Sequence, residues 1–142
     1  MAGWANFFKD KMADIDWLNS LGWNEDQIED LRNAGFAYIR QGKYEIALPF
    51  FEALIVLDND NAYDAQTLGA LYLQLNNPTK ALKYFDRALK LDADHAPTLL
   101  NVTKALFMLG KKEEGLKLAT ILKNEKNPAI ANVAKALVLA YT

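Results

Sequence analysis

The chain has 142 residues, 51% of them hydrophobic, which is enough for one domain with a buried core. Its 16 Lys and Arg residues balance 18 Asp and Glu residues, so it lacks the basic excess that is typical of nucleic-acid-binding proteins. The absence of Cys excludes disulfides and thiolate chemistry, and no stretch approaches the roughly 20 uncharged residues of a membrane-spanning helix. We therefore expect a cytoplasmic protein with no nucleic-acid partner and no membrane insertion.

The first predicted element is an N-terminal amphipathic helical extension in residues 1–24, with its helix at about 4–19. Apolar side chains follow helical spacing at Phe8, Met12 and Ile15. Exposed together, the large apolar groups would form a patch of the kind that marks an interface. We therefore expect the extension to fold back on the rest of the chain or to form a homodimer. The residues predicted for this dimer or partner interface are Trp4, Phe7, Phe8, Met12 and Trp17.

From residue 25 onward the sequence repeats. A shift of 34 residues aligns Gly35–Tyr38 with Gly69–Tyr72 and Phe51 with Phe85. A third copy keeps the hydrophobic period but has diverged, and Ala119 there replaces a large residue. This pattern resembles the tetratricopeptide repeat (TPR), a helix–turn–helix unit of 34 residues. The resemblance implies that the repeats stack into a superhelix.

Turn residues set the bounds of the predicted helices. Gly42 and Gly110 suit helix ends that need a positive φ angle, and Asn77-Pro78 and Asn127-Pro128 suit helix starts. The predicted helices span 25–41, 44–57, 62–75, 78–91, 96–109, 112–123 and 128–141. The predicted class is all-α, a TPR superhelix of three helix–turn–helix repeats with the N-terminal extension and a C-terminal capping helix. The TPR domain would cover residues 25–142, with repeats at about 28–61, 62–95 and 96–129 and the terminal helix at 128–141.

The last predicted helix is apolar over most of its surface. Ile130, Val133, Leu137, Val138 and Tyr141 do not fall on one narrow stripe. Three interpretations remain open. One side of the helix caps the third repeat, the helix contacts a partner or second subunit, or the chain naturally continues beyond residue 142.

No group of residues predicts catalysis or metal binding. The single histidine, His95, falls in a predicted loop between repeats, where a solvated side chain is the favoured interpretation. Asp58–Asn61 faintly resembles a calcium loop but lacks its turn glycine and final glutamate, so an ordinary turn is favoured. The sequence has no glycine-rich phosphate loop and no nucleophile elbow. We therefore predict no enzyme activity, no catalytic residue, no metal and no cofactor.

In the TPR family the first helix of each unit lines a concave face, which implies a peptide-binding groove here. Its lining would be mostly apolar, with a few polar groups that fix the peptide backbone. For Phe36, Leu73 and Leu100 a place in the core is the alternative interpretation. TPR units that clamp the C-terminal carboxylate of heat-shock chaperones have Lys and Asn where this chain has Arg32 and Phe36, so that partner is not expected. The predicted peptide-binding residues are Arg32, Phe36, Ile39, Arg40, Tyr63, Gln66, Ala70, Leu73, Leu100, Lys104 and Phe107.

One stretch supports a narrower resemblance. Gly42–Glu45, Ala47, Phe51–Leu54 and the closing Leu57-Asp58 are similar to the first repeat of the class II chaperones of bacterial type III secretion systems. The resemblance implies a cytoplasmic chaperone that holds an extended segment of a secreted translocator subunit in its groove and keeps it soluble. A needle-subunit chaperone of the same systems and a general TPR scaffold that joins folded proteins remain as alternatives.

Overall fold

The structure is a computed structural model that describes residues 23–142, and these residues form seven α-helices. The helix bounds are α3 Glu25–Arg40, α4 Tyr44–Leu57, α5 Ala62–Gln74, α6 Pro78–Leu91, α7 Ala96–Met108, α8 Lys112–Leu122 and α9 Pro128–Tyr141. The helix predicted at about 4–19, with Trp4, Phe7, Phe8, Met12 and Trp17, lies outside the described residues. No helix among residues 23–142 combines the length and hydrophobicity needed to cross a bilayer.

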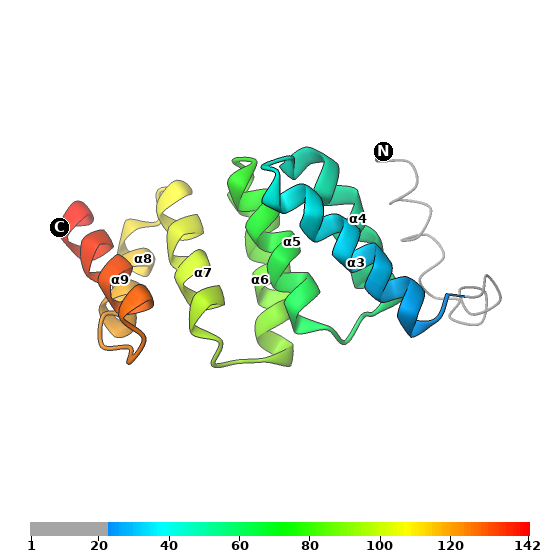
Figure 1. Cartoon of the computed structure of the whole chain (residues 1–142). Helices are drawn as coiled ribbons and strands as arrows, with labels where there is room; N and C mark the ends of the chain where they lie inside the picture. The colour runs from blue at the N-terminus through cyan, green and yellow to red at the C-terminus, as the bar shows by residue number, and fades with distance from the viewer. Residues whose placement is uncertain (1–22) are drawn as a thin grey trace.

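The helices pack in sequential pairs, α3 with α4, α5 with α6 and α7 with α8, and α9 packs on α8. The short turns inside the pairs lie along one edge of this row, and the loops between pairs lie along the opposite edge (Figure 1). The predicted all-α TPR fold is confirmed. Three helices have the predicted bounds. The other four end one residue earlier, because the last predicted residue of each is the C-cap.

The turns inside the three pairs share one backbone geometry. Gly42, Asn76 and Gly110 have positive φ angles of 73°, 62° and 76°. In the first turn the N–H of Lys43 donates to the carbonyl of Tyr38 at 2.9 Å, which closes the end of α3. The prediction that Gly42 and Gly110 end helices with positive φ is confirmed. Asn, after Gly, is among the residues that tolerate this conformation best.

We expect Gly42→Ala to lower the free energy of unfolding by about 1–2 kcal/mol, because a side chain at positive φ is strained against its own backbone. Neighbouring atoms would not contribute, since nothing lies within 4 Å of a Cβ placed on Gly42. Gly42→Asn is the matched control. Its free energy of unfolding should fall less than that of Gly42→Ala, because Asn76 has a positive φ angle at the equivalent position of the second repeat. Urea unfolding measures both variants, and an alanine variant as stable as the original chain would contradict the strained turn.

Glycines in the first helix of repeats one and two make room for aromatic rings from the second helix. A Cβ on Gly35 would lie 2.7 Å from the ring of Phe51, and a Cβ on Gly69 would lie 2.5 Å from the ring of Phe85. Both rings are fully buried. The two helices of each unit therefore approach closely through a glycine–phenylalanine contact.

The third repeat reverses this arrangement. Ala119 stands at the place of Phe51 and Phe85, so the second helix supplies no ring. Phe107 of the first helix fills the space instead, and a Cβ on Gly115 of the second helix would lie 2.8 Å from the Phe107 ring. The third repeat therefore also packs one aromatic ring against one glycine, but here the ring comes from the first helix and the glycine from the second. The divergence of the third copy is thus a compensated change in packing.

The described residues bury two hydrophobic clusters. The larger lies in α4, α5 and α6, covered by α3. The smaller contains Leu100, Leu122, Ile130 and Ala134, from α7, α8 and α9. One side of α9 therefore caps the third repeat, which agrees with the first of the three interpretations. Its other side exposes Leu139, which is 80% exposed.

Candidate peptide-binding groove

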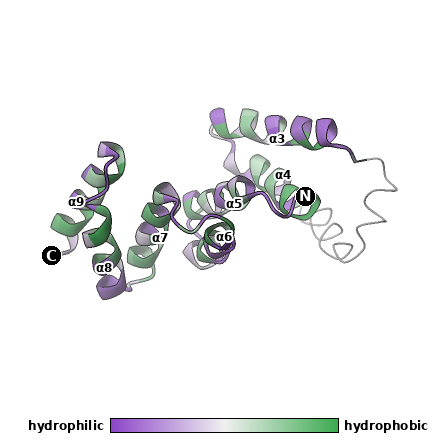
Figure 2. Cartoon of the chain, turned by 90° about the horizontal axis from the view of Figure 1, so that it is seen from below, coloured by the Kyte–Doolittle hydropathy of each residue, from purple (hydrophilic) through white to green (hydrophobic). Residues whose placement is uncertain are grey.

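The first helix of the row, α3, stands apart from α5, while α4 packs beside α5 (Figure 2). The space between α3 and α5 holds a cavity of about 230 Å³, which we call the first cavity. Five of its lining residues were predicted from the sequence, namely Phe36, Ile39, Tyr63, Gln66 and Ala70. The others are Tyr44, Thr67, Leu71 and Gln74. Tyr44 was missed because it belongs to a second helix, and the family rule places only first helices on the concave face.

Aromatic rings form one wall of the first cavity. The rings of Phe36 and Tyr63 lie 5.5 Å apart between centroids, and Phe36 also meets the buried Phe51 edge to face at 5.0 Å. Such pairs stabilise by about 0.5–1.5 kcal/mol beyond the burial of their area. Phe36 therefore belongs both to the cavity wall and to the packing of the first repeat. Tyr63 is 54% exposed and remains open to a ligand.

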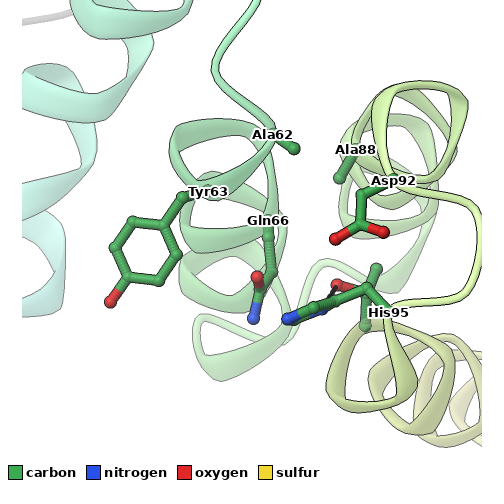
Figure 3. A pocket seen from close by; sticks show the side chains of 7 residues that line it. Ala62, Tyr63, Gln66, Ala88, Asp92 and His95 are labelled. Atoms are coloured by element: carbon green, nitrogen blue, oxygen red, sulfur yellow. Dashed lines mark hydrogen bonds between the residues drawn. The ribbon is translucent and has the colours of Figure 1, made fainter.

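A second cavity, of about 210 Å³, lies between repeats two and three. Its lining residues are Ala62, Tyr63, Gln66, Ala88, Asp92, His95 and Thr98 (Figure 3). Tyr63 and Gln66 line both cavities, so this part of α5 forms the ridge between them. The two cavities adjoin at α5, and their lining residues extend from α3 over α5 to the start of α7; we call this surface the groove.

His95 sits differently from the solvated loop residue that the sequence favoured. It is the N-cap residue of α7, is half-buried, and its Nδ1 lies 2.7 Å from the hydroxyl of Thr98. Figure 3 shows the His95 ring and the Gln66 amide pointing toward one another, with the Asp92 carboxylate beside them. The ring is therefore partly covered and lines the second cavity.

Arg32 lines neither of the two cavities. Its Nε and one Nη donate to the two carboxylate oxygens of Asp64 at 2.7 Å each, and the same Nη donates to Asp58 at 2.8 Å. The other Nη donates to Glu29. Asp64 is fully buried, and the hydrogen bonds from Arg32 to it raise the pKa of the guanidinium above its ordinary value. All three guanidinium nitrogens are thus used to tie α3 to α5.

The same network accounts for the acidic turn before α5. Asp58 accepts from Arg32 and, at 3.2 Å, from the amide of Asn61, and Asn61 caps α5 by accepting from the backbone of Asp64. Within the described part of the chain no group of His, Cys, Asp and Glu side chains could hold a metal ion. The interpretation of this stretch as an ordinary turn agrees with these contacts.

The remaining predicted residues lie outside both cavities. Leu73 is half-buried against the larger cluster, Leu100 is only 6% exposed, and Phe107 stacks on Tyr141 with ring centroids 3.9 Å apart. For Leu100 and Phe107 the structure therefore favours a role in packing. Arg40 is exposed at the end of α3 and Lys104 is half-buried on α7.

Solved structures with a similar fold include translocator chaperones with bound partners. PcrH of Pseudomonas aeruginosa, in complex with the chaperone-binding region of PopD, has a TM-score of 0.72 at 26% identity, over 84% of this chain and 94% of PcrH. PcrH in complex with the chaperone-binding region of PopB has a TM-score of 0.66 at 25% identity, over 82% of this chain and 98% of PcrH. The Yersinia enterocolitica type III secretion chaperone SycD, in complex with a peptide of the translocator YopD, has a TM-score of 0.74 at 24% identity, over 83% of this chain and 94% of SycD. Comparison with curated protein sequences finds no match.

The helical pairs and the groove across their first helices define a TPR protein, with a fold that matches the class II translocator chaperones of type III secretion over most of the chain. A family model, described as anaphase-promoting complex, cyclosome, subunit 3, matches residues 40–120. This is more than half of the chain, and the chain belongs to that family. The match runs from the end of α3 into α8 and thus covers the helical repeats.

Proposed function

We propose that the protein is a cytoplasmic chaperone of a type III secretion system that binds an extended segment of a secreted translocator subunit. The observation that carries this proposal is the groove of two adjoining cavities over α5. Its apolar walls would hold hydrophobic side chains, and Gln66 on the ridge between the cavities would fix the peptide backbone. The likeness to PcrH, which was solved with segments of PopD and PopB, supports the same role.

The physical benefit to the translocator follows from hydrophobic burial. A protein destined for a membrane carries apolar segments that would aggregate or insert too early. Burying one Leu, Val or Phe side chain contributes about 1.5–3 kcal/mol. Two or three such anchors in the groove would offset the cost of ordering an extended segment, and the occupied segment could no longer aggregate. The chain would act by binding, with no catalytic step.

Co-expression with translocator and needle subunits from the same genome tests this function. We expect a translocator subunit that is insoluble alone to become soluble and to co-purify with the chaperone. The control is expression of each subunit with an unrelated TPR protein. A soluble complex with a needle subunit alone would replace the translocator role by the needle role. If no secretion substrate is captured, the chaperone proposal fails and the scaffold alternative replaces it.

A further inference from the structure

The second cavity differs from the first in its unused polar groups. Within residues 23–142 the side chains of Gln66 and Asp92 have no hydrogen-bond or ion-pair partner, although both line this cavity. They enter it from separate elements, Gln66 from α5 and Asp92 from the C-cap of α6 (Figure 3). The free carboxylate and the amide oxygen are hydrogen-bond acceptors that converge on one space.

Charge around this cavity favours a cation. The loop after α6 holds Asp92 and Asp94, and Asp92 lines the cavity. The two cationic side chains that precede Asp92 most closely in α6 have partners of their own. Arg87 donates to the carbonyls of Ile55 and Asn59, and Lys90 pairs with Asp86. His95, which also lines the cavity, is hydrogen-bonded to Thr98 through Nδ1. Asp92 is exposed, has no ion-pair partner among the described residues, and lies at the C-terminal end of α6, where the helix dipole also favours a positive group.

The rest of the cavity suits an aliphatic stem. Ala62 and Ala88 line it with methyl groups, and the side chain of Tyr63 borders it toward the first cavity. Lys and Arg bury their methylene chains along apolar surface while the charged head reaches a polar group. A basic side chain would therefore satisfy both the apolar wall and the acceptors.

We propose that the second cavity selects a Lys or Arg side chain in the bound translocator segment, with Asp92 as its main acceptor and Gln66 as the second. This inference rests on the proposed groove function and adds to it a specificity that purely apolar anchors would not supply. The first cavity, with its aromatic wall, would take the neighbouring hydrophobic anchor, so the ridge of Tyr63 and Gln66 separates an apolar site from a cationic one.

Selection of random displayed 12-residue peptides against the full chain tests this specificity without knowledge of the partner. The selections use the original chain, Asp92→Asn, and Asp94→Asn as the matched control, at 150 mM salt. Asp94 carries the same charge two residues away but does not line the cavity. We expect Lys or Arg at a fixed distance from a hydrophobic anchor in peptides selected by the original chain and by Asp94→Asn. That preference should vanish with Asp92→Asn.

A selected peptide then gives the size of the effect by fluorescence anisotropy. Replacing its basic residue by norleucine should weaken binding to the original chain by up to about fivefold, and leave binding to Asp92→Asn unchanged. Hydrophobic anchors without a basic preference, or equal preference on Asp92→Asn, would overturn the cationic site and leave the groove function standing. If the original chain selects no peptide at all, the groove function itself fails and the cationic site with it.

Discussion

Ala70→Glu should reduce capture of the translocator segment by at least tenfold while the helical circular dichroism stays unchanged. Ala70 is half-buried on α5 and lines the first cavity between α3 and α5. A carboxylate there can reach water in the free protein. A bound segment would cover it without a partner, and burying an unpaired charge costs several kcal/mol. Pull-down of the co-expressed translocator measures the loss.

The control for this variant is Ala136→Glu, the same change at an exposed position of α9. It should bind like the original chain. Unchanged binding by Ala70→Glu would show that the segment binds elsewhere, and loss of helicity would show that Ala70 acts in the core. Ala70 is a better target than Phe36 or Phe107, because both rings also pack against buried residues.

Arg32→Ala should lower the free energy of unfolding by about 3–5 kcal/mol, the range typical of removing one partner from a buried ion pair. The variant leaves Asp64, which is fully buried, without its counter-charge. Thermal or urea unfolding of the full chain measures the loss. Lys90→Ala breaks the exposed pair with Asp86 and is the control, with an expected effect of about 0.5 kcal/mol or less.

A second substitution separates the buried charge from general loss of packing. Arg32→Ala combined with Asp64→Ala should recover part of the stability, because no unpaired charge remains in the interior. If the double variant is no more stable than Arg32→Ala, the ion pair is not the reason for the loss.

The sequence predicted the helices well because local signals decide them. Positive-φ residues end the first helices, and Asn side chains cap the starts of α5, α6 and α9. The 34-residue register also carried five groove residues to one cavity, since equivalent positions of stacked units face the same side. The helix ends depend on residues close by in the sequence, and the shared cavity position depends on the 34-residue repeat.

Several of the other predicted binding residues make tertiary contacts that neither the local signals nor the repeat register predicts. Arg32 has the register of a groove residue, but Asp64 and Asp58 lie close enough to turn it into the bridge between α3 and α5. Phe107 has the same register as Leu73, yet the exchange of ring and glycine in the third repeat draws it into the core. His95 is held by a local contact with the hydroxyl of Thr98, three residues further along the chain.

The buried hydrophobic residues of 23–142 fall into two clusters, one in α4 to α6 covered by α3 and one in α7 to α9. Val102 of α7 also packs against the first cluster, so the two are in contact. The second cavity is lined by Ala88 of α6 and Thr98 of α7, and it therefore lies at this junction. A segment bound there as proposed would contact helices of both clusters, and we expect native-state hydrogen exchange to show higher protection of α7 to α9 in the complex than in the free protein.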